Sequence, residues 1–286
     1  MAAGLTVLGS GSSGNATLLE ADGCAVLIDA GLGPRQIATR LATVGVSWPR
    51  IKAVLLTHLH ADHWNDRVFA HLLRQRIALW CHAEHLSVLR RQSSCFAAMQ
   101  RARLFRAYEA EECIAVTSLL QCRPLGVRHD SGAAFGFRFE CAANLFGDGW
   151  SVGYLCDLGC WDERLADALA DVDLLALEFN HDVAMQRTSG RSPQLIERVL
   201  GDEGHLSNDQ AADLLAAVQR RSSSDRLGRV VQLHLSRQCN RPELARIAAQ
   251  RVLDAAGSRA AIHTAEQDQP TERLTILRGE LARGAA

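Results

Sequence analysis

Residues 57–63 read THLHADH and directly follow a short apolar run that is typical of a buried strand. Side chains of an extended segment alternate between its two faces, so His58 and His60 are expected to point the same way. We expect a turn to bring Asp62 and His63 beside them. Three imidazoles and one carboxylate exceed what a single tetrahedral ion that also holds water can use. The stretch therefore predicts two adjacent metal ions, and the preceding apolar strand disfavours the alternative of a surface histidine cluster.

Two ions need further ligands, and the later part of the chain offers three more strand-end residues. His129, Asp157 and His234 each come after a short apolar run. We expect His129 to complete the ion held by the first two histidines of the motif, and His234 to complete the ion held by the motif's last two residues. The carboxylate of Asp157 can bridge the two ions. Any one of these residues could instead pack in the core or cap an element, but their shared position after a strand favours ligands.

The order of the remaining patterns predicts an α/β protein. Strand patterns occupy residues 5–8, 16–21, 24–28, 53–56, 77–81, 134–141, 151–156, 172–177, 230–233 and 274–277. Helical spacing occupies residues 37–44, 63–74, 83–91 and 162–170, and further helices are expected from 192, 208 and 242. This order fits a four-layer αββα arrangement, in which two mixed β-sheets are sandwiched between helices. No linker or repeat interrupts the chain, so we expect residues 1–286 to form a single domain.

Composition and charge exclude several classes of protein. The 31 basic and 32 acidic residues nearly cancel, so a uniformly basic nucleic-acid-binding surface is absent, although arginines cluster locally. No apolar run of about 20 residues could span a bilayer. The N-terminus lacks a signal-peptide pattern, so we expect a cytoplasmic protein with no membrane partner. The nine cysteines are odd in number and irregularly spaced, which favours reduced thiols and no disulfide-linked partner.

Five short motifs extend the pattern beyond THLHADH. They are GSSGN at 11–15, HD at 129–130, EFNHD at 178–182, GHLSN at 204–208 and HLSRQCN at 234–240. Together these residues resemble the metallo-β-lactamase superfamily and, within it, the YycJ/WalJ family. The resemblance implies a 5′-to-3′ DNA exonuclease, with DNA as its partner and a metal-bridging hydroxide as the nucleophile. Phe179 and Cys239 depart from the family pattern, which has serine and asparagine there, and neither is a proposed ligand.

The resemblance also implies roles for residues outside the metal ligands. His205 matches a non-ligand histidine of similar zinc phosphodiesterases, so we expect it to protonate the leaving oxygen; the alternative is that it only precedes a helix. Glu178 and Asp29 are expected to accept the second N–H of metal-bound imidazoles. Asp62, His205 and Glu178 are thus the expected catalytic residues. Candidate substrate contacts are His181, which could equally well pack, and the donors of the serine-rich turn, Ser12, Ser13 and Asn15.

The ligand types admit more than one metal and more than one substrate. Imidazole-rich sites suit zinc, and the carboxylates also admit manganese, so we expect two divalent ions per chain, Zn or Mn. A diiron site is disfavoured because it typically has an acidic residue where His60 stands. The alternative function is a small-molecule phosphodiesterase or an ester or thioester hydrolase, because the fold hosts many substrates. A non-enzymatic scaffold is disfavoured because every expected ligand is present.

Overall fold

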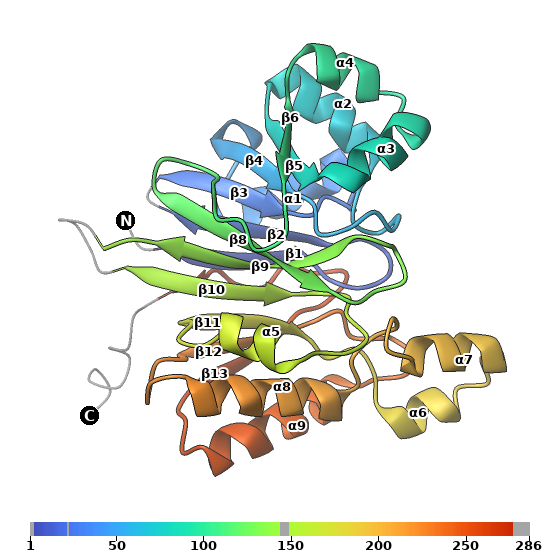
Figure 1. Cartoon of the computed structure of the whole chain (residues 1–286), viewed down its shortest axis with the longest axis vertical. Helices are drawn as coiled ribbons and strands as arrows, with labels where there is room; N and C mark the ends of the chain where they lie inside the picture. The colour runs from blue at the N-terminus through green and yellow to red at the C-terminus, as the bar shows by residue number, and fades with distance from the viewer. Residues whose placement is uncertain (1–2, 22, 144–148, 277–286) are drawn as a thin grey trace. The chain divides into compact units, whose positions relative to one another are not determined.

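Strand-forming runs between residues 4 and 108 pair with a short run at 274–275 into a seven-stranded sheet (Figure 1). The structure, a computed structural model, describes residues 3–21, 23–143 and 149–276. The strand order of this first sheet is β14-β1-β2-β3-β4-β5-β6. Its strands are β1 (Gly4–Gly9), β2 (Ala16–Ala21), β3 (Cys24–Ile28), β4 (Ile51–Leu55), β5 (Ala78–His82), β6 (Phe105–Tyr108) and β14 (Leu274–Thr275). The sheet is mixed, because β14 to β3 pair antiparallel and β3 to β6 pair parallel.

A second seven-stranded sheet follows in the order β13-β12-β11-β10-β9-β8-β7. Its strands are β7 (Ile114–Ala115), β8 (Leu120–Val127), β9 (Ala134–Cys141), β10 (Trp150–Leu155), β11 (Leu174–Glu178), β12 (Arg229–Leu233) and β13 (Ala261–Thr264). Strands β10 to β13 pair parallel, whereas β9 runs antiparallel to β10 and β7 antiparallel to β8. The carboxyl ends of β10, β11 and β12 therefore meet at one edge, which is where α/β sheets place ligands.

The chain divides into two compact units. The first consists of Met1–Pro124, Ser131–Phe135 and Glu266–Thr275, and the second of Leu125–Asp130, Gly136–Ala265 and Ile276–Ala286. The whole first sheet belongs to the first unit, and β10 to β13 belong to the second. The division passes through β8 and β9.

The helices of the first unit bury one apolar face each. They are α1 (Pro34–Thr43), α2 (Asp66–Gln75), α3 (Ala83–Gln92) and α4 (Phe96–Arg101), with the 3-10 turn η1 (Trp48–Arg50). Residues three or four positions apart share a helix face. Ile37 and Leu41 of α1 and Phe69 and Leu72 of α2 accordingly join the strand residue Val54 in one buried core.

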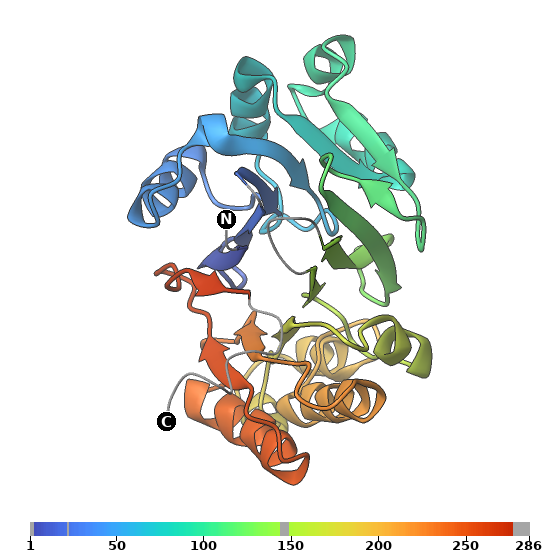
Figure 2. The same ribbon diagram turned by 90° about the vertical axis from the view of Figure 1, so that its left-hand side faces the viewer.

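The second unit has its own core under a separate set of helices. These are α5 (Glu163–Ala168), α6 (Val183–Arg187), α7 (Pro193–Leu200), α8 (Asn208–Arg221) and α9 (Pro242–Ala255). Leu215 of α8 and Ala249 of α9 are buried with Leu175 of β11 and Val230 of β12. Figure 2 shows α8 and α9 on the same side of the strands of their unit. The start of α8 is fixed by Ser207, whose side chain accepts from the third backbone N–H of the helix.

The predicted α/β class, two mixed sheets with flanking helices, is confirmed. Individual boundaries differ, because sequence periodicity marks element ends poorly. Helix α2 begins at Asp66 rather than at residue 63, and the short elements α4, β6, α6 and β13 were not expected. The strand expected at 274–277 is the short β14, and residue 277 lies outside the described residues. All nine cysteines are free thiols, and none of the described helices is long and apolar enough to cross a membrane.

Candidate metal centre and active site

The THLHADH motif lies in a tight loop and not on the end of a strand. Strand β4 ends at Leu55, and α2 begins only at Asp66. Between them the backbone N–H of His63 donates to the carbonyl oxygen of His60 at 2.9 Å, which closes the expected turn. His58 and His60 therefore come together through this loop rather than through strand alternation.

The loop gathers the four motif side chains within the first unit. The ring centroid of His58 lies 4.9 Å from that of His60 and 3.9 Å from that of His63. Asp62 Oδ2 lies 3.6 Å from His63 Nε2, and the Asp62 side chain is 20% exposed. Gly31 permits this packing, because a Cβ there would lie 1.7 Å from the carbonyl oxygen of Asp62. The rings of His60 and His63 thus both lie against that of His58, and Asp62 lies beside His63.

The carboxylate of Asp29 fixes the orientation of two of these rings. Asp29 is fully buried and accepts a hydrogen bond from His63 Nδ1 at 2.7 Å. The hydroxyl of Thr57 donates to Asp29 at 2.9 Å and lies 3.0 Å from His58 Nδ1, from which it accepts. Burial raises the pKa of Asp29, while the neighbouring His63 acts in the opposite direction. Both rings therefore carry a proton on Nδ1 and present the Nε2 lone pair, as metal-bound histidines do.

The serine-rich turn contains both exposed and inward-facing residues. Ser12 and Ser13 are exposed. Asn15 is buried, and its amide nitrogen lies 3.1 Å from Asp62 Oδ2 and 2.9 Å from His63 Nε2. Its backbone N–H donates to the carbonyl oxygen of Asp62 at 2.7 Å. Asn15 thus binds the motif loop, whereas the two serines face solvent.

In the second unit, three acidic and imidazole side chains lie at the carboxyl edge of parallel strands. Asp157 comes two residues after β10, Glu178 is the last residue of β11, and His234 directly follows β12. Asp157 and His234 have left-handed φ angles of 58° and 54°. A non-glycine residue adopts this conformation at an energetic cost, and such residues cluster at functional sites. The backbone therefore leaves the regular strand at the residues that carry the chemistry.

Glu178 connects the side chains of this edge. Its Oε1 lies 2.7 Å from Nδ1 of His205 and 3.2 Å from Nδ1 of His234. Its Oε2 accepts two backbone N–H groups, at 3.1 and 3.3 Å. Asp157 Oδ1 lies 3.1 Å from Nδ1 of both histidines. One ligand atom from each of these four residues can be chosen so that all lie within 4.8 Å of one another.

The charges of His205 and Glu178 stabilise each other. Burial lowers the pKa of His205, but the charge of Glu178 and the hydrogen bonds to Asp157 and Glu178 outweigh it and raise the pKa to about 9. Burial raises the pKa of Glu178, but the charge of His205 and hydrogen bonds from His205 and His234 bring it to about 2. At neutral pH the pair is therefore a charged imidazolium and a carboxylate. The His205 side chain is 18% exposed, so its proton can reach a substrate.

His129 lies beside this cluster, at the end of β8. Its Nδ1 lies 2.9 Å from the carbonyl oxygen of Gly204, which accepts the ring proton. Its ring centroid is 5.1 Å from that of His205. Asp130 follows it and forms an ion pair with Arg198. His129 thus presents Nε2, in the same tautomer as the imidazoles of the first unit.

His181 is placed for packing rather than for contact with a substrate. It is fully buried, and neither ring nitrogen has a hydrogen-bond partner among the described residues. Burial, more than any neighbouring charge, lowers its pKa to about 4, so the ring is neutral. Of the two expectations for this residue, packing is the one that the geometry favours.

Sequence reasoning missed two polar residues that hold the candidate site together. Thr57 connects Asp29 with His58, and its position directly before the motif was the available signal. Asn180 Nδ2 donates to Glu178 Oε1 at 3.2 Å and to the carbonyl oxygen of His234 at 3.0 Å. Its spacing of two residues from Glu178, which places both on one side of an extended segment, could have indicated it.

The donor chemistry of both units fits divalent metal ions. Each unit supplies imidazoles and a carboxylate, which are ligands for zinc and manganese. Internal acceptors hold the Nδ1 proton of four imidazoles, those of His58, His63, His129 and His234. This hydrogen bonding selects the tautomer that coordinates a metal through Nε2.

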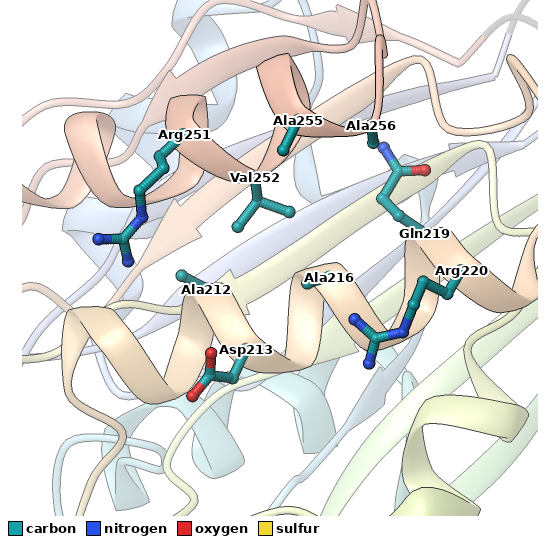
Figure 3. A pocket seen from close by; sticks show the side chains of 9 residues that line it. All are labelled: Ala212, Asp213, Ala216, Gln219, Arg220, Arg251, Val252, Ala255 and Ala256. Carbon is teal, nitrogen blue, oxygen red and sulfur yellow. The ribbon is translucent and has the colours of Figure 1, made fainter.

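A separate hollow lies between α8 and α9 of the second unit (Figure 3). Its volume is about 510 Å³, and its floor is made of alanines and Val252. Asp213, Arg220 and Arg251 line it, and none of the expected site residues does. This hollow is thus not where the histidines and carboxylates gather.

The fold and these histidines agree with a known family. A family model described as a beta-lactamase superfamily domain matches residues 25–227. The chain belongs to the metallo-β-lactamase superfamily. The metallo-β-lactamase fold protein YhfI of Bacillus subtilis has a TM-score of 0.67 at 14% identity, covering 95% of this chain and 99% of that one. Superfamily membership and the donor set make the chain a metal-dependent hydrolase.

Two curated relatives are similar over most of their length. Exodeoxyribonuclease WalJ of Streptococcus pneumoniae (strain D39) is 29% identical over 248 residues, 84% of each chain. Exodeoxyribonuclease YycJ of Bacillus anthracis is 26% identical over 279 residues, 93% of this chain and 97% of the relative. The likeness to the YycJ/WalJ family is therefore shown. Phe179 and Cys239, which depart from its motifs, are fully buried.

Proposed function

We propose that the chain is a dinuclear metal-dependent phosphodiesterase that degrades DNA from 5′ ends. The DNA substrate is supported by relatives named exodeoxyribonucleases, which match 84% and 93% of this chain. The observation that carries phosphodiester chemistry is the Glu178–His205 pair, which holds a proton at neutral pH beside the candidate ligands.

We propose that the chain holds two divalent ions. His58, His60 and His129 would hold one ion, Asp62, His63 and His234 would hold the other, and Asp157 would supply a carboxylate ligand. We also propose that residues 1–286 act as a single domain. When bound, zinc or manganese ions lower the pKa of water and neutralise phosphate charge.

The chain's own residues complete the reaction. As hydroxide forms the new P–O bond, the bond to the leaving oxygen breaks, and that oxygen needs a proton. His205 donates it from Nε2, because Nδ1 is held by Glu178 at 2.7 Å. Glu178 keeps the ring oriented and charged, and Asp29 keeps His63 in the tautomer that binds metal. At pH 7 the proton for the leaving oxygen therefore comes from His205, which is not one of the proposed metal ligands.

The alternative is a small-molecule phosphodiesterase or an ester or thioester hydrolase of the same fold. A thiolate leaves without a proton, so a thioester hydrolase has no need of the His205–Glu178 pair. This pair therefore favours an oxygen leaving group. The matches to exodeoxyribonucleases favour DNA over a small molecule.

End-labelled linear DNA and a plasmid circle, each incubated with purified protein and manganese or zinc, test the proposal. We expect stepwise loss of nucleotides from the 5′ end and no cleavage of the circle. Hydrolysis of bis(p-nitrophenyl) phosphate or a thioester with no cleavage of DNA would leave a metal hydrolase and refute the nuclease.

A further inference from the structure

Arg191 lies in the segment between α6 and α7 and is held by two glutamines. Its Nε and one terminal nitrogen donate to Gln238 Oε1 at 3.1 and 3.0 Å. Its other terminal nitrogen donates to Gln186 Oε1 at 3.4 Å. Gln238 follows His234 by four residues, so the guanidinium is tied to the loop that carries a candidate ligand.

The partners of Arg191 orient it without neutralising it. Other arginines of the second unit are paired with carboxylates: Arg198 with Asp130, Arg221 with Asp167 and Arg226 with Asp173. Within residues 3–21, 23–143 and 149–276, Arg191 has only amide oxygens as partners. A half-buried guanidinium ordinarily takes a carboxylate, so this arrangement preserves a directed positive charge.

The second glutamine adds an independent sign of function. Gln186 is fully buried, and its Nε2 has no hydrogen-bond partner among the described residues. Leaving a buried amide nitrogen unpaired costs about 1–3 kcal/mol, so such groups in native proteins call for an explanation. Its side-chain oxygen accepts a hydrogen bond from Arg191, which fits a role in orienting this guanidinium.

Arg191 is within electrostatic reach of the candidate active site. Its charge is among the causes that lower the pKa of His181, together with the charge of His205. Figure 1 shows α6 and α7, which flank Arg191, projecting past the sheet of their unit. The described structure gives Arg191 no contact with a proposed metal ligand or with His205. An anion bound to Arg191 would therefore be distinct from the reacting group.

We propose that Arg191 binds a phosphate of the DNA strand adjacent to the phosphate that is cleaved; this inference rests on the proposed nuclease function. A guanidinium has five N–H donors, and three are used by the glutamines, so each terminal nitrogen keeps one for a phosphate oxygen. Arg191 thereby distinguishes a polynucleotide from a simple phosphodiester, which has no neighbouring phosphate.

The test compares Arg191→Ala and Arg191→Lys with Arg220→Ala, which removes an exposed charge on α8 without a partner in the described structure. For single-stranded DNA we expect Arg191→Ala to raise KM about tenfold with kcat nearly unchanged. Loss of one phosphate contact weakens binding and lowers the slope of log binding constant against log salt concentration by about one. The KM of Arg191→Lys should lie between those of the wild type and Arg191→Ala, because lysine keeps the positive charge but lacks the planar guanidinium. Hydrolysis of bis(p-nitrophenyl) phosphate should be unchanged in all variants.

Binding of a fluorescent oligonucleotide in chelator separates this inference from the proposed function. We expect Arg191→Ala to weaken binding and Arg220→Ala to leave it unchanged. If the wild type degrades DNA while Arg191→Ala matches it in KM and binding, or if Arg191→Ala equally impairs bis(p-nitrophenyl) phosphate, the inference alone is refuted. If the wild type neither binds nor degrades DNA, the proposed function fails and the inference with it.

Discussion

Nδ1 of His205 lies 2.7 Å from Oε1 of Glu178, a carboxylate with no exposed surface. The buried charge keeps the imidazole protonated and directs its second nitrogen outward. The same carboxylate also contacts His234, a candidate ligand, at 3.2 Å. One side chain thus orients both the candidate acid and a candidate metal ligand.

Glu178→Gln removes the charge while nearly preserving the shape. Without it the pKa of His205 should fall, so the alkaline limb of the pH–rate profile should move to lower pH. General acid catalysis contributes about 10²–10⁴-fold, so we expect kcat at pH 8 to fall by about 10–100-fold. A pH–rate series on DNA measures both effects. Unchanged position of the alkaline limb would show that Glu178 does not set the protonation of His205.

The ion pair should also contribute to the stability of the metal-free protein in a pH-dependent way. The folded pKa of His205 is about 9, above the ordinary 6.5, so its contribution is complete below pH 6.5 and is lost as pH rises through 9. Thermal unfolding in chelator should show the largest difference in Tm between wild type and His205→Ala near pH 6. A difference that stays constant from pH 6 to 9.5 would contradict the pairing.

Asp29→Asn tests the orientation of the first-unit imidazoles. Asn can present its oxygen to His63 Nδ1 but lacks the charge that makes the ring a stronger ligand. Loss of such carboxylate partners typically costs about 10–100-fold in metal affinity. Competition with a chelator measures the affinity, and Asp213→Asn, an exposed carboxylate on α8, is the matched control. Equal affinity of Asp29→Asn and the control would mean that Asp29 only supports the loop.

The sequence could predict those features of the fold and of the candidate site that depend on residues close together in the chain. Asp157 and His234 follow short apolar runs, and the carboxyl ends of neighbouring parallel strands lie at one edge of a sheet. The backbone conformation of THLHADH was harder to predict, because the residue at which β4 ends depends on the pairing of β4 with β3 and β5. The strand alternation expected for His58 and His60 fails for that reason.

The individual contacts of the supporting residues could not be predicted, because those contacts join distant segments of the chain. Asn180 acts through a hydrogen bond to the carbonyl of His234, a residue 54 positions away. The guanidinium of Arg191 is held by Gln238, a residue 47 positions away. The motif made His181 a candidate for substrate contact. Its burial, which favours packing, is visible only in the folded structure. The five-residue helix α6 leaves too short a helical pattern to recognise.

The proton of His205 is tested most directly by replacing the leaving oxygen of the DNA with a bridging sulfur. A thiol has a pKa near 8.5, far below that of an alcohol, so a thiolate leaves without protonation. We expect His205→Ala to lose about 10²–10⁴-fold in rate on ordinary DNA and to cleave the sulfur-bridged DNA at nearly the wild-type rate. The same loss on both substrates would contradict His205 as the general acid, and no cleavage of either by the wild type would contradict the nuclease.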